Sequence, residues 1–305
     1  MNGNKISFSH AKAPGFSYIL KDYLSMFKVH LCIYISLSAI LGHVMAGKSF
    51  SSTSLVLGFF VMVLAFGSAV LNNVQDREYD RFFQRTCKRS LPQKRVPVFH
   101  AKVISLIMIG FGLSGLLFAT GFYPFVWGAV AVFCYNGLYT PLKKKSLLAI
   151  IPGSLTGMLP PLIGWTAAGK SMPDSHIFIL MTIFGLWQIP HFFIILLKTR
   201  QAQTATDSLK RFPCFTTFFS KNEIKLQILI WTSLYSLAIL LFLMNGSIKN
   251  PVLSSISGLN AVGVIFFIST IMLNQQAKTI SIAFAAINLS MLLFMGAGIC
   301  DKCFL

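Results

Sequence analysis

Apolar residues occur along the chain in long runs that are separated by short polar segments. The runs cover residues 27–46, 54–74, 101–121, 123–140, 147–167, 175–197, 225–245, 252–273 and 281–299. About 20 helical residues cross the hydrocarbon core of a bilayer, and each run approaches that length. The pattern therefore predicts an all-α polytopic membrane protein, built as a bundle of nine transmembrane helices.

Glycine and proline mark two irregularities in this pattern. Only Gly121 and Phe122 separate the third run from the fourth, so these two helices are expected to form a tight hairpin. The fifth run contains Pro152, Pro160 and Pro161, which predict a kinked helix because proline lacks a backbone donor and clashes with the preceding turn. Such a kink is tolerated in a membrane where neighbouring helices satisfy the freed carbonyls.

The amino-acid composition is also that of a membrane protein. The chain of 305 residues is 55% hydrophobic and 11% charged, with a mean hydropathy of +0.70. The formal net charge of +18 would suggest a nucleic-acid partner in a soluble protein, but in a membrane protein basic residues gather in cytoplasmic loops. The lipid bilayer is therefore an expected partner, and nucleic acid is not.

The distribution of Lys and Arg predicts an orientation in the membrane. These residues are abundant before the first run, in segments 75–98 and 143–145, and after the sixth run, whereas the alternate connections carry few. Because basic loops stay in the cytoplasm, we expect the N-terminus inside and the C-terminus outside. The expected organisation is a cytoplasmic segment 1–26, a membrane domain 27–299 and an outer tail 300–305.

A polar stretch from residue 72 to 95 directly follows the second run. Asp76, Glu78 and Asp80 are three of the eight acidic residues of the whole chain. On a helix, Asn72, Asp76 and Asp80 would lie on one face, because a step of four residues turns about 400°. Two carboxylates and an amide suit a hard cation such as Mg²⁺. A solvated cytoplasmic loop is the alternative interpretation, but the scarcity of acids elsewhere favours a site.

Basic residues surround this face and recur at the cytoplasmic ends of other runs. Guanidinium and ammonium groups beside metal-bound carboxylates suit the oxygens of a diphosphate. The candidate diphosphate-binding residues are Arg77, Arg85, Lys88, Arg89, Lys143, Lys198 and Arg200. The outer ends of the runs carry nothing comparable, so we expect one cytoplasm-facing cavity with an acidic metal face on one wall.

Two further side chains are candidates for contact with a second substrate. His191 falls about two helical turns before the cytoplasmic end of the sixth run, and a polar group at membrane depth is costly unless it faces a cavity or a partner. Pro190 would open the helix beside it. Tyr139 ends the fourth run at the same side of the membrane. The alternative for His191 is a hydrogen bond to a neighbouring helix.

Several sequence strings resemble those of a known family. They are Asn72 with Asp76-Arg77-Glu78-Tyr79-Asp80, then Arg85-Thr86-Cys87-Lys88-Arg89-Ser90-Leu91, Tyr139-Thr140, Pro160-Pro161-Leu162-Ile163-Gly164-Trp165 and Trp187-Gln188-Ile189-Pro190-His191-Phe192. With the runs and the basic loops, these strings resemble the intramembrane prenyltransferases of the UbiA superfamily. Within it, they are most similar to the heme O synthase (protoheme IX farnesyltransferase) branch. The resemblance covers roughly residues 65–200.

The resemblance implies an enzyme of the bacterial inner membrane, with its active site on the cytoplasmic side. It would transfer a farnesyl group from farnesyl diphosphate to a vinyl group of heme B, with water addition, giving heme O. Asn72, Asp76 and Asp80 would be the catalytic residues and the ligands of the cofactor Mg²⁺. His191 and Tyr139 would contact the acceptor. The product would pass to a heme-copper terminal oxidase or to a heme A synthase.

The chain departs from this branch after the sixth run, where the branch carries a second acidic motif. Here the sequence reads Lys198-Thr-Arg-Gln-Ala-Gln203, with Gln201 and Ala202 in place of acids and no acid before Asp207. Lys198 and Arg200 could neutralise the diphosphate directly, Asp207 could fold back, or activity could be lost. A prenyltransferase for another membrane-accessible acceptor, such as an aromatic ring, and a non-catalytic heme-related paralogue or transporter therefore stay open as alternatives.

The cysteines give no metal-binding pattern. Cys300 and Cys303 form a C-x-x-C pair at the end of the chain, which we interpret as incidental because no strand or helix is expected to present it. Their thiols could pair in an oxidising compartment.

Overall fold

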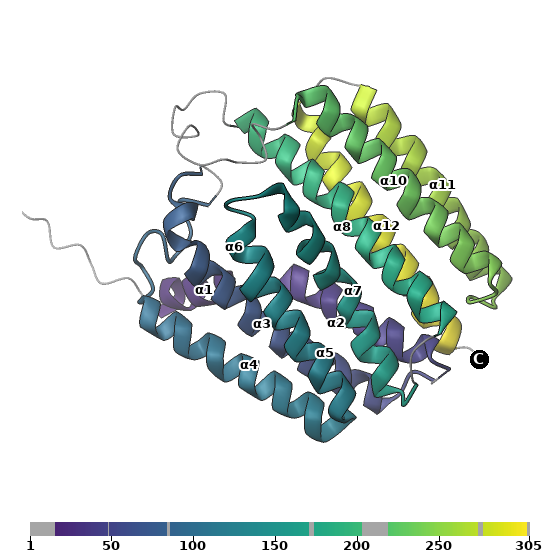
Figure 1. Cartoon of the computed structure of the whole chain (residues 1–305), viewed down its shortest axis with the longest axis horizontal. Helices are drawn as coiled ribbons and strands as arrows, with labels where there is room; N and C mark the ends of the chain where they lie inside the picture. The colour runs from purple at the N-terminus through teal and green to yellow at the C-terminus, as the bar shows by residue number, and fades with distance from the viewer. Residues whose placement is uncertain are drawn as a thin grey trace, which may run out of the picture.

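A computed structural model describes residues 16–47, 49–83, 86–170, 174–202, 219–273 and 277–303 (Figure 1). Throughout these ranges the regular secondary structure is helical, and they contain no β-strand. The prediction of an all-α protein is therefore confirmed for the part of the chain that the structure describes.

The helices follow the apolar runs of the sequence. They are α1 (Phe16–Met26), α2 (Val29–Met45), α3 (Ser52–Asp80), α4 (Val98–Thr120), α5 (Phe122–Val132), the π-helix η1 (Phe133–Tyr139), α6 (Thr140–Leu142), the 3₁₀-helix η2 (Leu147–Ala149), α7 (Ile150–Ala167), α8 (Ser175–Ala202), α10 (Lys221–Met244), α11 (Pro251–Leu273) and α12 (Ala277–Cys303). Each predicted run overlaps at least one of them.

The predicted count of nine membrane crossings is not confirmed by the length and hydropathy of the described helices. Within the described ranges seven helices are long and apolar enough to cross a membrane, and the bent pair formed by α1 and α2 would make eight. The proline-containing helix α7, which occupies the fifth predicted run, is not among the seven. A multi-pass membrane protein is confirmed, whereas the count of nine crossings is not.

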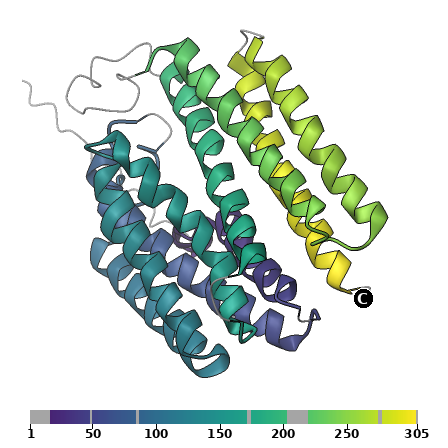
Figure 2. The same ribbon diagram turned by 45° about the vertical axis from the view of Figure 1, so that its right-hand side comes forward.

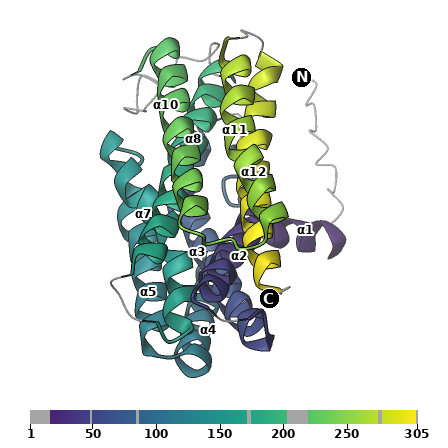
Figure 3. The ribbon, with the colours of Figure 1, turned by 90° about the vertical axis from the view of Figure 1, so that its right-hand side faces the viewer.

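The long helices form one bundle with two sides. On one side α3 packs against α4, and α5 packs against α4 and α7; on the other side α8, α10, α11 and α12 pack together. Figures 1 and 2 show these two groups, and Figure 3 shows α1 projecting sideways from the bundle. Because α7 contacts α8 and α12 contacts α2, the two sides enclose a shared interior.

The contact between α2 and α7 depends on two glycines. A Cβ atom added to Gly164 would collide with the backbone carbonyl of Ala39, and one added to Gly42 would collide with the backbone of Pro161. Small residues let transmembrane helices approach until their backbones touch. The Pro-Pro-Leu-Ile-Gly-Trp string therefore has a packing role, since it places Gly164 at this crossing.

The hairpin of α4 and α5 agrees with its prediction, but the second helix of this hairpin is less regular than expected. Gly121 alone separates α4 from α5, and its φ of 109° lies in the region that favours glycine. The run 123–140 was expected to form one regular helix, yet it widens into the π-helix η1 before α6. Such π-segments are rare and often occur at functional sites.

The C-terminal cysteines are presented differently from the prediction. Helix α12 extends to Cys303, so the C-x-x-C pair lies on its last turn, and the expectation that no helix would present it was wrong. Both Cys300 and Cys303 are exposed and unpaired.

Candidate functional site

The end of α3 carries the three polar residues that the sequence placed on one face. The helix continues without interruption to Asp80, and Asn72, Asp76 and Asp80 are only 1%, 3% and 5% exposed. Glu78, on the same two turns, keeps 60% of its side chain exposed. The predicted arrangement on a single face is therefore present, and this face points into the protein.

Two lysines from the segment after α6 hold the carboxylate of Asp76. The Nζ of Lys143 donates a hydrogen bond to Asp76 Oδ2 at 2.5 Å. The Nζ of Lys144 lies 2.9 Å from Asp76 Oδ1 as an ion pair, and it donates its hydrogen bond to the backbone carbonyl of Gln75 at 2.7 Å. Both oxygens of this buried carboxylate therefore face an ammonium group.

Asn72 is linked to two other elements of the fold. Its Oδ1 accepts a hydrogen bond from Lys28 Nζ at 2.6 Å, and its Nδ2 donates to Thr140 Oγ1 at 2.9 Å and to Asp76 Oδ2 at 3.0 Å. Lys28 stands at the junction of α1 and α2 with a φ of 50° and a ψ of 49°, a left-handed conformation that is uncommon outside glycine. This backbone conformation accompanies the turn that directs its amino group to Asn72.

The sequence analysis missed Lys28 and Thr140. A signal for Lys28 existed, because this lysine lies inside the apolar run 27–46, where a cationic group needs a partner. Thr140 was marked only as part of the Tyr139-Thr140 string that carries the family resemblance, and not as a partner of Asn72.

The loop after α3 supplies the partner of Asp80. Arg89 Nη1 donates a hydrogen bond to Asp80 Oδ2 at 2.8 Å, and Thr86 Oγ1 donates to the backbone carbonyl of Asp80 at 3.0 Å. Further along this loop, Arg95 forms two hydrogen bonds with Asp22 of α1. The hydrogen bonding to Asp22 raises the pKa of Arg95 above its usual value, so Arg95 stays protonated in this ion pair between the loop and α1.

Several predicted diphosphate ligands lie elsewhere. Arg77 contacts Glu78 and donates to the backbone carbonyl of Val74, so it faces away from the acidic pair. Lys88 and Lys198 are exposed. Arg85 lies outside the described residues, as do Asp207 and the side chains of Arg200, Gln201 and Ala202. Of the seven predicted cations, the structure brings Arg89 and Lys143 to the acidic face.

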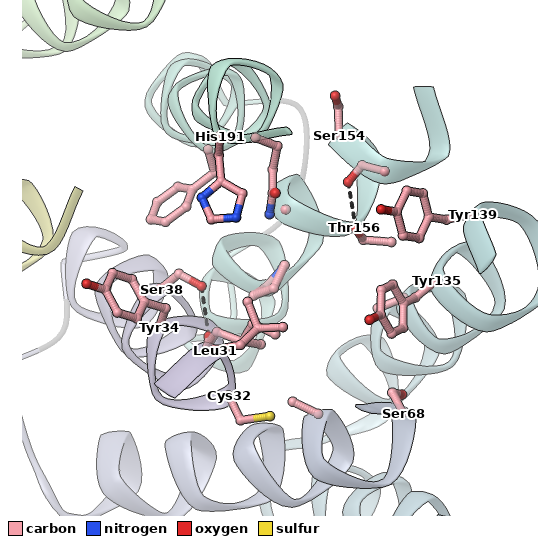
Figure 4. Close-up of a pocket in the computed structure, with 18 of the residues that line it drawn as sticks. Leu31, Cys32, Tyr34, Ser38, Ser68, Tyr135, Tyr139, Ser154, Thr156 and His191 are labelled. Atoms are coloured by element: carbon pink, nitrogen blue, oxygen red, sulfur yellow. Dashed lines mark hydrogen bonds between the residues drawn. The ribbon is translucent and has the colours of Figure 1, made fainter. Parts of the chain in front are cut away.

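A cavity of about 280 Å³ lies beside this cluster. It is lined by residues of α2, α3, α5, η1, α7, α8 and α12, most of them apolar. Figure 4 shows Tyr135 and Tyr139 on one wall of the cavity, with Tyr34 and His191 on the opposite side. A mostly apolar space with few polar groups is the usual form of a small-molecule site.

Tyr139 connects the cavity with the charged cluster. Its ring stacks on Tyr135, with the centroids 5.7 Å apart and the planes within 14° of parallel. The ammonium of Lys143, which binds Asp76, lies 5.3 Å from the centroid of Tyr139. A molecule with an anionic head and an apolar tail could therefore contact the lysine and the cavity at the same time.

His191 lines the cavity from α8 and is held by aromatic neighbours. Its ring centroid lies 4.9 Å from that of Trp187 and 4.8 Å from that of Phe284 on α12. The indole nitrogen of Trp187 donates to the backbone carbonyl of Ile287 at 3.0 Å, which fixes this neighbour. The Nδ1 atom of His191 is buried and has no hydrogen-bond partner among the described residues. This ring nitrogen is therefore an unsatisfied polar atom on a residue that lines the cavity.

The donor atoms on α3 fit a magnesium ion that also binds a phosphate group. Asn72, Asp76 and Asp80 present oxygen atoms from one buried face, the chemistry that Mg²⁺ prefers. The described ranges contain no group of three or more His, Cys, Asp or Glu residues that could hold a metal without help. In proteins Mg²⁺ is often held by one or two carboxylates and completes its coordination with substrate phosphates and water.

Together these features define a multi-pass membrane protein with a charged cluster beside an apolar cavity. Residues 35–295 match the UbiA prenyltransferase family, and the chain belongs to that family. It is therefore a prenyltransferase. The chain is 35% identical over 219 residues to the protoheme IX farnesyltransferase of Geobacter sulfurreducens, an alignment that covers 72% of this chain and 79% of the relative.

Solved structures of archaeal proteins share the fold. An apo UbiA homolog from Aeropyrum pernix K1 superposes with a TM-score of 0.73 at 13% identity, covering 90% of this chain and 98% of that one. A UbiA homolog from Archaeoglobus fulgidus bound to DMAPP and Mg²⁺ gives a TM-score of 0.70 at 15% identity, covering 93% of this chain and 100% of that one. At these identities the likeness concerns the fold.

Proposed function

We propose that this prenyltransferase transfers a farnesyl group from farnesyl diphosphate to a vinyl group of heme B, with addition of water, to give heme O. The observation that carries the proposal is the junction at Tyr139, where the charged cluster on α3 meets the apolar cavity that contains His191. The similarity to the Geobacter sulfurreducens protoheme IX farnesyltransferase supports this choice of substrates.

The charged cluster is the proposed site of the diphosphate. Asn72, Asp76 and Asp80 would hold Mg²⁺, which supplies Lewis-acid stabilisation of the leaving diphosphate. The Archaeoglobus fulgidus homolog, solved with DMAPP and Mg²⁺, supports a role for this ion in the fold. Arg89 and Lys143 already contact the two carboxylates, and they would bind diphosphate oxygens as the allylic carbon–oxygen bond breaks.

Other cations keep a proposed part in this step. Lys28 and Lys144 are added because each contacts the acidic face. Arg77, Arg85, Lys88, Lys198 and Arg200 remain candidates from the sequence, as ligands that would approach when the substrate is bound.

The cavity is the proposed site of the farnesyl chain and of the porphyrin edge. Its apolar walls would exclude water from the allylic cation until the vinyl group has attacked it. The stacked rings of Tyr135 and Tyr139 stand beside Lys143, where that cation would form. His191 would position heme B through its free Nδ1, and water would then quench the cation on the former vinyl carbon.

The membrane orientation is part of the same proposal. The cluster lies among the basic segments 75–98 and 143–145, which the positive-inside rule places in the cytoplasm together with the N-terminus. Farnesyl diphosphate would then arrive from the cytoplasm. The product would pass to a heme-copper oxidase or to a heme A synthase.

A second acceptor class fits one feature of the cavity. The rings of Tyr34 and Trp187 are nearly parallel, at 8°, with their centroids 6.4 Å apart. Such flat walls would also suit an aromatic acceptor smaller than a porphyrin.

Pigment analysis of membranes tests the proposal. The chain is expressed in a bacterial host that lacks its own heme O synthase, and extracted hemes are separated by chromatography with mass detection. We expect heme carrying a hydroxyethylfarnesyl group. Unmodified heme B alone, with the protein inserted in the membrane, would contradict heme as the acceptor, and a prenylated aromatic lipid in the same extract would identify the second class.

A further inference from the structure

Most of the oxygen atoms that would bind a metal ion already contact amino or guanidinium groups of the chain itself. Lys143 and Lys144 take the two oxygens of Asp76, and Arg89 takes Oδ2 of Asp80. Lys28 takes the amide oxygen of Asn72. A divalent cation that approached this face alone would have to displace groups that are hydrogen-bonded or ion-paired there.

Charge makes that displacement unfavourable without an anion. Three cationic side chains contact the two carboxylates, which leaves an excess of positive charge before any metal arrives. Lys143 and Lys144 are largely shielded from solvent, since 20% and 23% of their side chains are exposed. Separating a largely shielded cation from its anionic partner leaves it unpaired in a poorly hydrated environment, which is strongly unfavourable.

A diphosphate removes this obstacle. It brings several anionic oxygens, and these can accept the hydrogen bonds that the two lysines now donate to Asp76 and to the backbone. The carboxylate is then free for a divalent cation, and that cation and the diphosphate neutralise each other.

We propose that Lys143 and Lys144 act as exchangeable counter-ions of Asp76, so that the divalent cation and the diphosphate bind as a coupled pair. This inference rests on the diphosphate site of the proposed function. It adds that the site has a low affinity for the metal without diphosphate and a higher affinity with it. Without diphosphate, the lysines exclude the metal; with diphosphate, they move to its oxygens and Asp76 binds the metal. Coupling of this kind is reciprocal, so the metal raises the affinity for diphosphate by the same factor.

The wild-type protein in lipid nanodiscs provides the first measurement. Binding of Mn²⁺, used as a spectroscopic substitute for Mg²⁺, is titrated by electron paramagnetic resonance with and without saturating inorganic pyrophosphate. Free Mn²⁺ and the Mn²⁺–pyrophosphate complex in solution are subtracted with protein-free samples. We expect Mn²⁺ to bind at least roughly tenfold more tightly when pyrophosphate is present. Equal affinities in the two titrations would overturn the proposal.

A double variant distinguishes counter-ion exchange from an ordinary shared site. In Lys143→Met with Lys144→Met, Asp76 has lost its competing cations, so Mn²⁺ alone is expected to bind on the order of tenfold more tightly than in the wild type. Pyrophosphate is expected to bind more weakly. Loss of Mn²⁺ affinity in a folded double variant would contradict counter-ion exchange, because it would show that the lysines favour metal binding instead of competing with it.

The control is Lys145→Met, which removes the next lysine of the same loop. Lys145 is exposed and lies outside the contacts around Asp76, so both affinities should match the wild type. The single variant Lys144→Met serves if the double variant does not insert, and its Mn²⁺ affinity should change in the same direction.

The outcomes also separate this inference from the proposed function. If pyrophosphate does not bind with or without Mn²⁺, the diphosphate site itself is wrong. If pyrophosphate and Mn²⁺ both bind tightly but independently, the diphosphate site stands and the exchange is wrong. Neither titration depends on the identity of the acceptor.

Discussion

The last turns of α3 present two faces with the same kinds of residues and opposite surroundings. On the inner face, Asp76 and Asp80 are buried and each pairs with a cation from another part of the chain. On the outer face, Glu78 is exposed and pairs with Arg77 at 3.5 Å and with Arg81 at 2.7 Å, its neighbours on the same segment. Only the inner face joins elements that are distant in sequence.

The difference in burial between the two faces decides which carboxylates are candidates for chemistry. An exposed ion pair contributes about 0–1 kcal/mol to stability, and its loss leaves both groups hydrated. A buried carboxylate cannot be hydrated, so it requires its partners or a replacement for them. We therefore expect substitutions of similar chemistry to have very different effects on the two faces of this helix.

The largest effect is expected for Asp76→Asn on the inner face. The substitution keeps the shape of the side chain but removes the charge that would hold Mg²⁺, and prenyl transfer should fall roughly a thousandfold. Turnover is measured with labelled farnesyl diphosphate in membranes, after immunoblotting has shown equal insertion. Activity within tenfold of the wild type would remove Asp76 from the metal site.

A smaller loss is expected for Lys28→Met. The variant keeps the aliphatic part of the side chain but loses the hydrogen bond to Asn72 Oδ1, and the loss of a part-buried hydrogen bond of this kind corresponds to roughly a 10- to 100-fold loss of activity. The matched control is Lys21→Met, because Lys21 is exposed on α1. Equal activities of the two variants would mean that Lys28 has only a structural role.

His191→Phe tests the cavity side of the comparison. Phenylalanine preserves the packing against Trp187 and Phe284 but removes the free Nδ1, so kcat/KM for the heme acceptor should fall roughly tenfold. Binding of pyrophosphate with Mn²⁺ should not change, because it takes place in the charged cluster. An equal loss in both measurements would show that the substitution disturbs the bundle as a whole.

The smallest effect is expected for Glu78→Gln on the outer face. It breaks two exposed ion pairs, and activity should change by less than about twofold. Asp80→Asn is measured beside it, because both substitutions replace a carboxylate by an amide and the two positions are two residues apart on one helix. A loss as large as that of Asp80→Asn would show that the outer face also contacts substrate.

The sequence predicted the parts of this structure that depend on spacing within one helix. The four-residue spacing of Asn72, Asp76 and Asp80 was sufficient to place them on one face, and Gly121 was sufficient to place a turn. Hydropathy located the helical segments, although within the described residues seven or eight of them have the length and hydropathy of a membrane crossing, so that the count of nine is not confirmed.

The partners of the acidic face were only partly predictable. Lys28 and Thr140 lie 44 and 68 positions from Asn72, and their contacts with it depend on how three elements pack. Spacing in the sequence does not determine such packing. Arg77 was predicted as a diphosphate ligand, but its position on α3 directs its side chain toward Glu78. The π-helix gave no sequence signal that we identified.

The glycine crossing of α2 and α7 has a consequence for motion. Both helices line the cavity, and their backbones touch near Gly42 and Gly164, so we expect this pair of helices to move as one stiff body. Any widening that admits a bulky substrate must then come from other walls, and the π-helix 133–139, with its irregular hydrogen bonding, is the softer one. Amide hydrogen exchange should accordingly be faster in residues 133–139 than in residues 39–43. The reverse order would mean that the crossing of α2 and α7 is the more flexible part.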